Sequence, residues 1–320
     1  MMDLTDKEDE IVKNVYFDHD GNVDDLVSLL LLLQMPEVNL IGVGVIDADG
    51  YIEGSVPASR KIITRFGNGA QVSVAASNSR AVHQFPKEWR LSSFSFDAFP
   101  LLNEHGGPTT PLAEKPAHLD MIDKLKQADG KTDLVMTGPL TDLARALEVD
   151  PTIVDNIQRL YWMGGTMRTE GNVLEPKHDG TAEWNAYWDP EAVKAVFDAD
   201  IDIQMVGLES TNQVPLNADV QQHWASLRRY PMMDLIGQGY ALVSSYEANS
   251  TYYLWDVLTT VASQYPDLIQ SKDIHGDVLT TGAGAGRTFE TDNGRPINLV
   301  TEVDGQAFYD KFDELLTQGH

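Results

Sequence analysis

The 320-residue chain contains no cysteine, which excludes disulfide bonds, thiolate metal sites and a cysteine nucleophile. Basic residues are also scarce, because 23 lysines and arginines stand against 49 aspartates and glutamates, for a formal net charge of −26. A surface this acidic repels phosphate backbones. We therefore expect no nucleic acid among the partners of the protein.

Long apolar runs are missing as well. None approaches the roughly 18–20 residues that a membrane-spanning helix needs, so we expect no membrane partner. The first residues, MMDLTDKEDEIVK, are acidic and polar, whereas a secretory signal has basic residues followed by an apolar stretch. This pattern favours a cytoplasmic protein.

What the sequence does contain is an alternation of short apolar strands with helices. Such alternation predicts an α/β fold with a doubly wound, mainly parallel central sheet flanked by helices. We expect a flexible tail at residues 1–13 and a single domain over residues 14–320. The predicted strands are 14–17, 40–46, 71–76, 134–138, 160–165 and 203–208, and the predicted helices are 24–35, 55–67, 139–149 and 190–199.

Two stretches differ from this scaffold. Residues near 77–117 are rich in proline, serine and glycine, and residues 244–256 (SSYEANSTYYLWD) place aromatic side chains in a polar context. Connections this long are usually functional, so we predict that both are active-site loops. Residues 282–287 (GAGAGR) lack the Lys-Ser/Thr ending of a phosphate-binding loop and predict a hairpin turn.

The segment VYFDHDGNVDD concentrates Asp18, Asp20, Asp24 and Asp25 where the first strand meets the first helix. Ligands bind at such strand ends in doubly wound sheets. A helix N-terminus stabilises an anion by only about 0.3–1 kcal/mol, so four carboxylates there require a cation or protonation. Ca²⁺ and Mg²⁺ select all-oxygen sites of this kind. The plain alternative is that Asp24 caps the helix while the other carboxylates are solvated.

A metal site permits two chemistries. In the first, the metal lowers the pKa of a bound water and a neighbouring carboxylate takes its proton. In the second, DxDG after a strand resembles the first motif of haloacid-dehalogenase-type phosphatases, with Mg²⁺, Asp18 as the nucleophile and Asp20 as the general acid. That motif usually continues with threonine or valine, whereas Asn22 follows here. The later basic and acidic residues of such a phosphatase are also poorly matched.

Several motifs occur in one order along the chain, from about Asn14 to Phe312: DHDGNVDD, MTGPLTDLA, WMGGTMRTEGNV, DGTAEWNAYWDP, STNQVP and YYLWDVLT. In this the chain resembles the nucleoside hydrolases. FPKEWR and the Trp255-Asp256 pair resemble their purine-preferring (inosine–adenosine–guanosine) branch. The resemblance implies Ca²⁺-dependent hydrolysis of the N-glycosidic bond of purine ribonucleosides by a homodimer. A non-catalytic nucleoside-binding protein remains the other alternative.

The resemblance also implies a role for each matching residue. Asp20 is the general base, and Asp24 and Asn185 join it in the catalytic set. Carboxylates and amides suit ribose hydroxyls, and two indole rings suit a flat base held between them. The implied metal ligands are Asp20, Asp25, Asp256 and the Thr137 carbonyl. The implied substrate-binding residues are Asn22, Asp24, Asp49, Trp89, Met163, Asn172, Glu183, Asn185 and Trp255.

Some neighbouring residues have supporting roles in this interpretation. Asp18 and Asp47 support the site, and His19 is a loop neighbour of it. The purine branch has a basic residue before its Trp-Asp pair, which this chain lacks. Tyr246, Tyr252 or Tyr253 is expected to take its place. We expect the remaining tryptophans of the aligned motifs to be packing residues: Trp162, Trp184 and Trp188.

Overall fold

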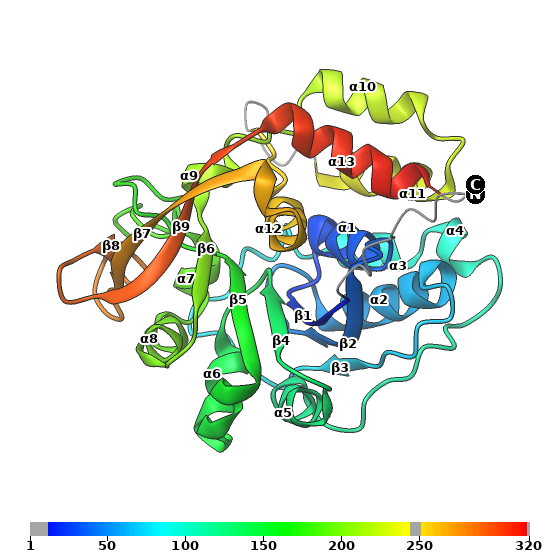
Figure 1. The fold of residues 1–320 in the computed structure, drawn as a ribbon. Coiled ribbons are helices and arrows are strands. Elements are labelled where there is room, and N and C mark those ends of the chain that lie inside the picture. The colour runs from blue at the N-terminus through cyan, green and yellow to red at the C-terminus, as the bar shows by residue number, and fades with distance from the viewer. Residues whose placement is uncertain (1–11, 244–250, 319–320) are drawn as a thin grey trace, which may run out of the picture.

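The computed structural model describes residues 12–243 and 251–318, and within them the chain builds a nine-stranded sheet in the order β3-β2-β1-β4-β5-β6-β9-β7-β8 (Figure 1). The first seven strands in this order, β3-β2-β1-β4-β5-β6-β9, pair in parallel. The strand β7 is antiparallel to both of its neighbours, β9 and β8. The predicted doubly wound, mainly parallel sheet is confirmed. The strands are β1 (Lys13–His19), β2 (Val38–Val45), β3 (Val74–Ala76), β4 (Thr132–Met136), β5 (Ile157–Met163), β6 (Ile203–Val206), β7 (Ile269–Val278), β8 (Thr288–Glu290) and β9 (Arg295–Val303).

The order of the strands reverses between β1 and β4. From β1 the chain proceeds through β2 to β3 at one edge, and from β4 it proceeds through β5 to β6 in the other direction. The connections therefore leave these neighbouring strands on opposite sides, which opens a crevice at their carboxyl ends. The acidic segment after β1 and the loop after β4 both lie at this crevice.

Helices cover both faces of the sheet (Figure 1). One layer contains α1, α2, α11, α12 and α13, and the opposite layer contains α5, α6 and α8. Every residue of α1 is buried, because this helix packs against α2, α11 and α12 and shares a core cluster with side chains of β1 and β2. Its long leucine run is thereby explained. The bounds in these layers are α1 (Val23–Leu32), α2 (Ile52–Phe66), α5 (Ala117–Gln127), α6 (Thr141–Val149), α8 (Pro190–Asp198), α11 (Pro231–Val243), α12 (Trp255–Gln264) and α13 (Gly305–Thr317).

The remaining elements are short or peripheral. Two of them, α3 and α4, lie in the stretch 77–117, which was expected to be a loop and is therefore only partly irregular. The predicted hairpin turn at 282–287 is confirmed, because it joins the antiparallel strands β7 and β8. The elements are α3 (Ser92–Asp97), α4 (Pro100–Asn103), α7 (Trp184–Trp188), α9 (Leu208–Thr211), α10 (Ala218–Ser226) and two 3₁₀ helices, Pro151–Asn156 and Pro266–Leu268.

The predicted boundaries are close to those observed. The first helix ends at Leu32 instead of Met35, and β1 already begins at Lys13. The rest of the expected tail, residues 1–11, and residues 244–250 of the second expected loop lie outside the described residues. Within the described part of the chain, no helix has both the length and the apolar character needed to cross a bilayer.

The close pairing of β1 and β2 beneath the crevice yields a stability prediction. Gly44 pairs with Asp18, and a Cβ added to Gly44 would lie 2.0 Å from Asp18 Oδ2 and 3.3 Å from the Tyr16 hydroxyl. Because overpacking a buried site typically costs about 1–3 kcal/mol, Gly44→Ala should lower the free energy of unfolding by about this amount. The measurement is urea denaturation. Gly107→Ala is the control, since no heavy atom lies within 4 Å of its added Cβ. Equal stability of the two variants would contradict the packing described here.

Candidate active site

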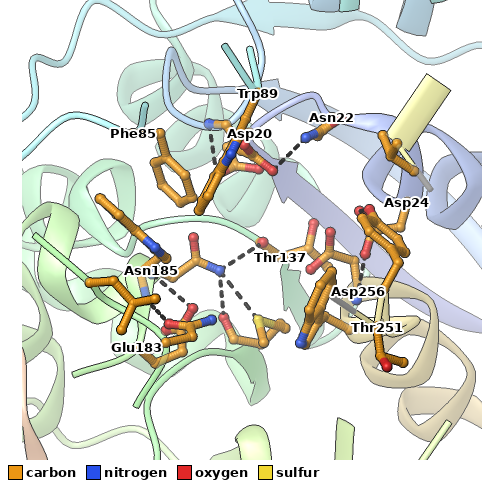
Figure 2. Close-up of a pocket in the computed structure, with 18 residues that line it drawn as sticks. Asp20, Asn22, Asp24, Phe85, Trp89, Thr137, Glu183, Asn185, Thr251 and Asp256 are labelled. Carbon is orange, nitrogen blue, oxygen red and sulfur yellow. Dashed lines mark hydrogen bonds between the residues drawn. The ribbon is translucent and has the colours of Figure 1, made fainter. Parts of the chain in front are cut away.

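A cavity of about 250 Å³ opens at the carboxyl ends of the central strands (Figure 2). Every residue that the sequence interpretation assigned to the site lines it, except Asp25, which is fully buried. In Figure 2, Phe85 and Trp89 lie on one side of the view and Asp24 and Asp256 on the other. The lining residues are Asp20, Asn22, Asp24, Asp49, Phe85, Trp89, Thr137, Met163, Asn172, Leu174, Glu183, Trp184, Asn185, Val243, Thr251, Tyr252, Trp255 and Asp256.

Asn22 shapes the turn from β1 into α1. Its side-chain oxygen accepts a hydrogen bond from the Val23 backbone N–H at 2.7 Å, and its own backbone N–H donates to Asp25 Oδ2 at 2.9 Å. This reciprocal arrangement is a capping box. The alternative in which Asp24 caps the helix is therefore wrong, and so is the solvation it assumed: Asp18, Asp20, Asp24 and Asp25 are all buried.

Asp25 joins the ends of the two central strands. Its Oδ1 accepts from the Thr137 hydroxyl at 2.6 Å and from the Asp20 backbone N–H at 3.4 Å. Asp24 makes a second long-range connection, because its two oxygens accept from the Tyr252 hydroxyl at 2.8 Å and from the Asp256 backbone N–H at 3.3 Å. The starts of α1 and α12, which are far apart in sequence, are thereby held together.

Asp24, Asp25 and Asp256 each present a carboxylate oxygen, and these three atoms lie within 4.8 Å of one another. A hard divalent cation accepts such an all-oxygen set. The metal set inferred from the sequence contains Asp20 where this group contains Asp24. Asp20 lies beside the group, and its Oδ2 accepts from the Asp49 backbone N–H at 3.2 Å.

Burial dominates the electrostatics of these carboxylates. It raises the pKa of Asp25 to about 7 and the pKa of Asp49 to about 8, and nearby carboxylates add to both shifts. Burial also raises the pKa values of Asp20, Asp24 and Asp256. A low-dielectric site disfavours the charged form, and several like charges disfavour it further. At neutral pH the carboxylates therefore require protons or a cation to remain close together.

On another wall of the cavity, Glu183 begins helix α7. Its Oε1 accepts from the Asn185 backbone N–H at 2.9 Å, and its Oε2 accepts from the Gly165 backbone N–H at 2.8 Å. Burial raises the pKa of Glu183 to about 7 in spite of these bonds. The Asn185 side-chain amide donates to the carbonyls of Thr137 and Met163, both at 3.1 Å. The start of α7 is thus fixed to the ends of β4 and β5.

Asn172 enters this wall from the loop after β5. Its side-chain oxygen accepts from the Trp184 backbone N–H at 3.1 Å. This hydrogen bond joins the loop that carries Asn172 to the start of α7 at the cavity.

Aromatic rings form two groups in the cavity wall. Trp89 meets Trp184 edge-on with ring centroids 5.6 Å apart, and Trp184 also stacks on Phe85 at 5.0 Å. Trp255 meets Tyr252 edge-on at 4.7 Å. Trp184 is buried and packs against the rings of Trp89 and Phe85, as expected for a packing residue, and it also lines the cavity, which the sequence interpretation did not assign to it. Trp162 and Trp188 are fully buried, as expected for packing residues.

Some lining residues were not found by sequence reasoning. Phe85 lies in the FPKEWR motif, Leu174 closely follows Asn172, and Val243 and Thr251 flank residues 244–250. Their positions beside assigned residues were the available signal. Of the tyrosines expected to replace a basic residue, Tyr252 lines the cavity, whereas Tyr246 lies outside the described residues.

Asp18 has no access to the cavity. It is completely buried and does not line the wall, and burial together with the charges of Asp142 and Asp25 raises its pKa well above the usual range. A phosphatase nucleophile must reach its substrate in ionised form. Asp18 cannot reach a substrate in the cavity, and its raised pKa disfavours the ionised form, so the phosphatase alternative is overturned. His19 is also buried, and burial lowers its pKa to about 3.

The raised pKa values predict how stability depends on pH. Asp25 and Asp49 keep their protons up to about pH 7 and 8 in the fold, whereas an unfolded aspartate loses its proton near pH 4. The metal-free protein should therefore lose up to about 1.4 kcal/mol of stability per pH unit and per carboxylate between these limits. Denaturant unfolding of chelated protein from pH 5 to 8 measures this slope. Asp49→Asn should flatten it, whereas the exposed Asp292→Asn should not. A free energy of unfolding that rises between pH 5 and 8 would contradict the raised pKa values of these carboxylates.

Comparisons with known proteins agree with this geometry. The model of the family "Inosine-uridine preferring nucleoside hydrolase" matches residues 15–310. The crystal structure of an inosine-uridine preferring nucleoside hydrolase from Bacillus anthracis is 53% identical, covers 96% of this chain and 100% of its own, and has a TM-score of 0.92.

Two relatives by sequence also match most of their length. The non-specific ribonucleoside hydrolase RihC of Escherichia fergusonii is 29% identical, over 95% of this chain and 98% of the relative. The probable uridine nucleosidase 2 of Arabidopsis thaliana is 28% identical, over 88% of this chain and 86% of the relative. The chain belongs to the inosine-uridine preferring nucleoside hydrolase family and is a ribonucleoside hydrolase that cleaves the N-glycosidic bond.

Proposed function

We propose that this enzyme is a Ca²⁺-dependent hydrolase with a preference for purine ribonucleosides, and that it acts as a homodimer, as the resemblance of its motifs implies. The observation that carries the metal assignment is that carboxylate oxygens of Asp24, Asp25 and Asp256 lie within 4.8 Å of one another in one buried site. The observation that supports purine preference is the aromatic lining of the same cavity, with Trp89 and Trp255 in its wall.

The side chains present fit a calcium ion. Asp25, Asp256 and the Thr137 carbonyl would hold it together with Asp20, and the geometry adds Asp24 as a further ligand. Four or five protein oxygens leave positions for water and ribose hydroxyls in the 6–8-fold shell of Ca²⁺. When bound, the ion supplies positive charge that keeps these carboxylates ionised and lowers the pKa of a nearby water.

Asp20 is the proposed general base. It lines the cavity, and the Asp49 backbone N–H fixes one of its carboxylate oxygens at 3.2 Å. A carboxylate held in this way takes a proton from the attacking water, which is then directed at C1′ of the ribose. Fixing the base removes orientational freedom that would otherwise have to be lost in the transition state.

Asp24, Asn172, Glu183 and Asn185 are the proposed partners of the ribose hydroxyls, and Met163 lines the same wall. Cleavage of a glycosidic bond passes through a transition state that resembles an oxocarbenium ion. Carboxylates that are already fixed beside the sugar stabilise the positive charge that develops there. Asn185 is held by the carbonyls of two strand ends, so its position is set by the sheet itself.

The proposed base site lies between Trp89 and Trp255, with Asp49 and Asn22 at its edge. Indole faces stack on a purine over a larger area than on a pyrimidine, which favours purines. The Asn22 side-chain amide donates to Asp49 Oδ2 at 2.6 Å. We therefore propose that Asn22 contributes to base recognition in part by orienting Asp49.

Substrate profiling tests the function directly. Chelated enzyme should release no reducing sugar from inosine, and added Ca²⁺ should restore release. With Ca²⁺ present, kcat/KM for inosine, adenosine and guanosine should exceed that for uridine and cytidine by about fivefold or more, which corresponds to a difference of about 1 kcal/mol in stacking free energy. Equal kcat/KM for inosine and uridine would refute purine preference. Binding of inosine without any release of sugar would instead indicate a non-catalytic protein.

Substitution of the general base tests the mechanism. Asp20→Asn keeps an oxygen that can accept from the Asp49 N–H but cannot take a proton from water, so kcat should fall by roughly 10²–10⁴-fold. Inosine should still bind, which calorimetric titration can measure in the absence of turnover. Asp292→Asn, on the exposed surface, serves as the matched control. Undiminished turnover in Asp20→Asn would exclude Asp20 as the base.

A further inference from the structure

Arg90 is a buried cation directly after Trp89, with an exposed fraction of 6%. Its Nε donates to the Ala48 carbonyl at 2.7 Å, and its Nη2 donates to the Asp47 carboxylate. The guanidinium also lies over the Tyr51 ring, 4.0 Å from the ring centroid. All of these partners belong to one short segment, the 47–51 loop, which follows β2. Arg90 therefore fastens the segment that carries Trp89 to this loop.

The 47–51 loop is itself fixed to the acidic site. The Asp49 backbone N–H donates to Asp20 Oδ2 at 3.2 Å, and the Gly50 backbone N–H donates to the Asp20 carbonyl at 2.7 Å. Asp49 Oδ2 also accepts from the Asn22 amide at 2.6 Å. Arg90 is thus one step removed from the proposed general base, although it does not line the cavity.

A second connection to the same place comes from Ser92, which also follows Trp89 in the chain. Ser92 Oγ lies 2.6 Å from Asn22 Oδ1 and 3.1 Å from the Trp89 carbonyl oxygen, so it is within hydrogen-bond distance of both. By contrast, Lys87 and Glu88, which precede Trp89, have side chains that are 80% and 66% exposed. Arg90 and Ser92 thus connect the segment after Trp89 to the site, while Gln84, before Trp89, donates to the Asp47 carbonyl at 2.8 Å.

We propose that Arg90 is a positioning residue for base recognition: by fastening the Trp89 segment to the 47–51 loop, it sets the position of the Trp89 ring relative to the carboxylate cluster. This inference rests on the proposed stacking of Trp89 on the nucleobase. Arg90 acts through Trp89 and does not touch the substrate. The affinity for the base then depends on Arg90 only while Trp89 is present.

The requirement is for arginine and not for positive charge alone. A planar guanidinium donates along two edges while its face stacks on an aromatic ring, whereas an ammonium group is a compact charge without a stacking face. Arg90→Lys keeps the charge but loses this geometry. It therefore separates positioning from a general electrostatic effect on the acidic site.

A double-mutant cycle between Arg90→Lys and Trp89→Ala tests the proposal with inosine and Ca²⁺. Arg90→Lys should raise KM by about 5–10-fold with kcat within about threefold of wild type, and Trp89→Ala should raise KM by about 10-fold or more. The double variant should match Trp89→Ala within about twofold, because contacts that act in series are not additive. Titration calorimetry with free hypoxanthine should show the same pattern in Kd without turnover.

Further variants support the cycle. Ser92→Ala removes one hydroxyl of the second connection and should also raise KM. If Arg90→Lys does not fold, Asp47→Asn, which weakens the contact of Arg90 with its carboxylate partner, takes its place in the same cycle. Arg159→Lys is the matched control, because Arg159 also donates through Nε and Nη2 to a carboxylate, that of Asp202, at 2.8 and 2.6 Å. Arg159 does not line the cavity, so its substitution should leave KM unchanged.

The outcomes separate this inference from the proposed function. If the effects of Arg90→Lys and Trp89→Ala multiply in the double variant, Arg90 does not act through Trp89 and the proposal is wrong. The same follows if Arg90→Lys lowers kcat while KM and the hypoxanthine Kd stay at wild-type values. If Trp89→Ala itself leaves KM for inosine unchanged, the proposed stacking fails first, and the inference fails with it.

Discussion

Electrostatic repulsion among buried carboxylates is the constraint around which this site is organised. Asp20, Asp24, Asp25, Asp49 and Asp256 lie in or beside one buried site, and burial raises the pKa of each. Their hydrogen-bond donors are neutral backbone N–H groups, hydroxyls and an amide, which stabilise a carboxylate much less than a full positive charge does. The fold by itself therefore leaves the negative charge of these carboxylates without a compensating positive charge. A cation that supplies this charge gains affinity from every carboxylate that the fold holds in place.

The fold reduces this repulsion by placing several of the carboxylates at the N-termini of helices. Asp24 and Asp25 lie in the first turn of α1, Asp256 lies in the first turn of α12, and Glu183 precedes α7. Three helix N-termini thus present partial positive charge to the cavity. The strand order places the ends of β1 and β4 between them. Residues far apart in sequence meet because the topology converges there, and each carboxylate also has a local partner that fixes its direction.

Sequence patterns predicted the parts of this arrangement that depend on local physics. Apolar runs located the strands, and the acidic segment after the first strand was identified as a ligand site because strand ends are where ligands bind. The proximity of Asp256 to Asp25 could not follow from any periodicity, since it depends on how the sheet closes, and it came only from the family resemblance. Trp184 was rightly expected to pack, but its place in the cavity wall depends on the fold around it and was missed. The short helices α3 and α4 were missed because few residues define them.

The site also divides into parts with different physical support. The residues proposed for cleavage lie at strand ends and helix starts. There the Thr137 hydroxyl donates to Asp25, and the Asn185 amide donates to the Thr137 carbonyl. The proposed base site is built from connecting segments, and contacts of Arg90 and Ser92 hold the segment that carries Trp89. Segments of this kind tolerate change better than a packed sheet does. Shared identity along the scaffold therefore establishes the bond that is cleaved, while the choice of base is decided by a few contacts that the scaffold does not determine.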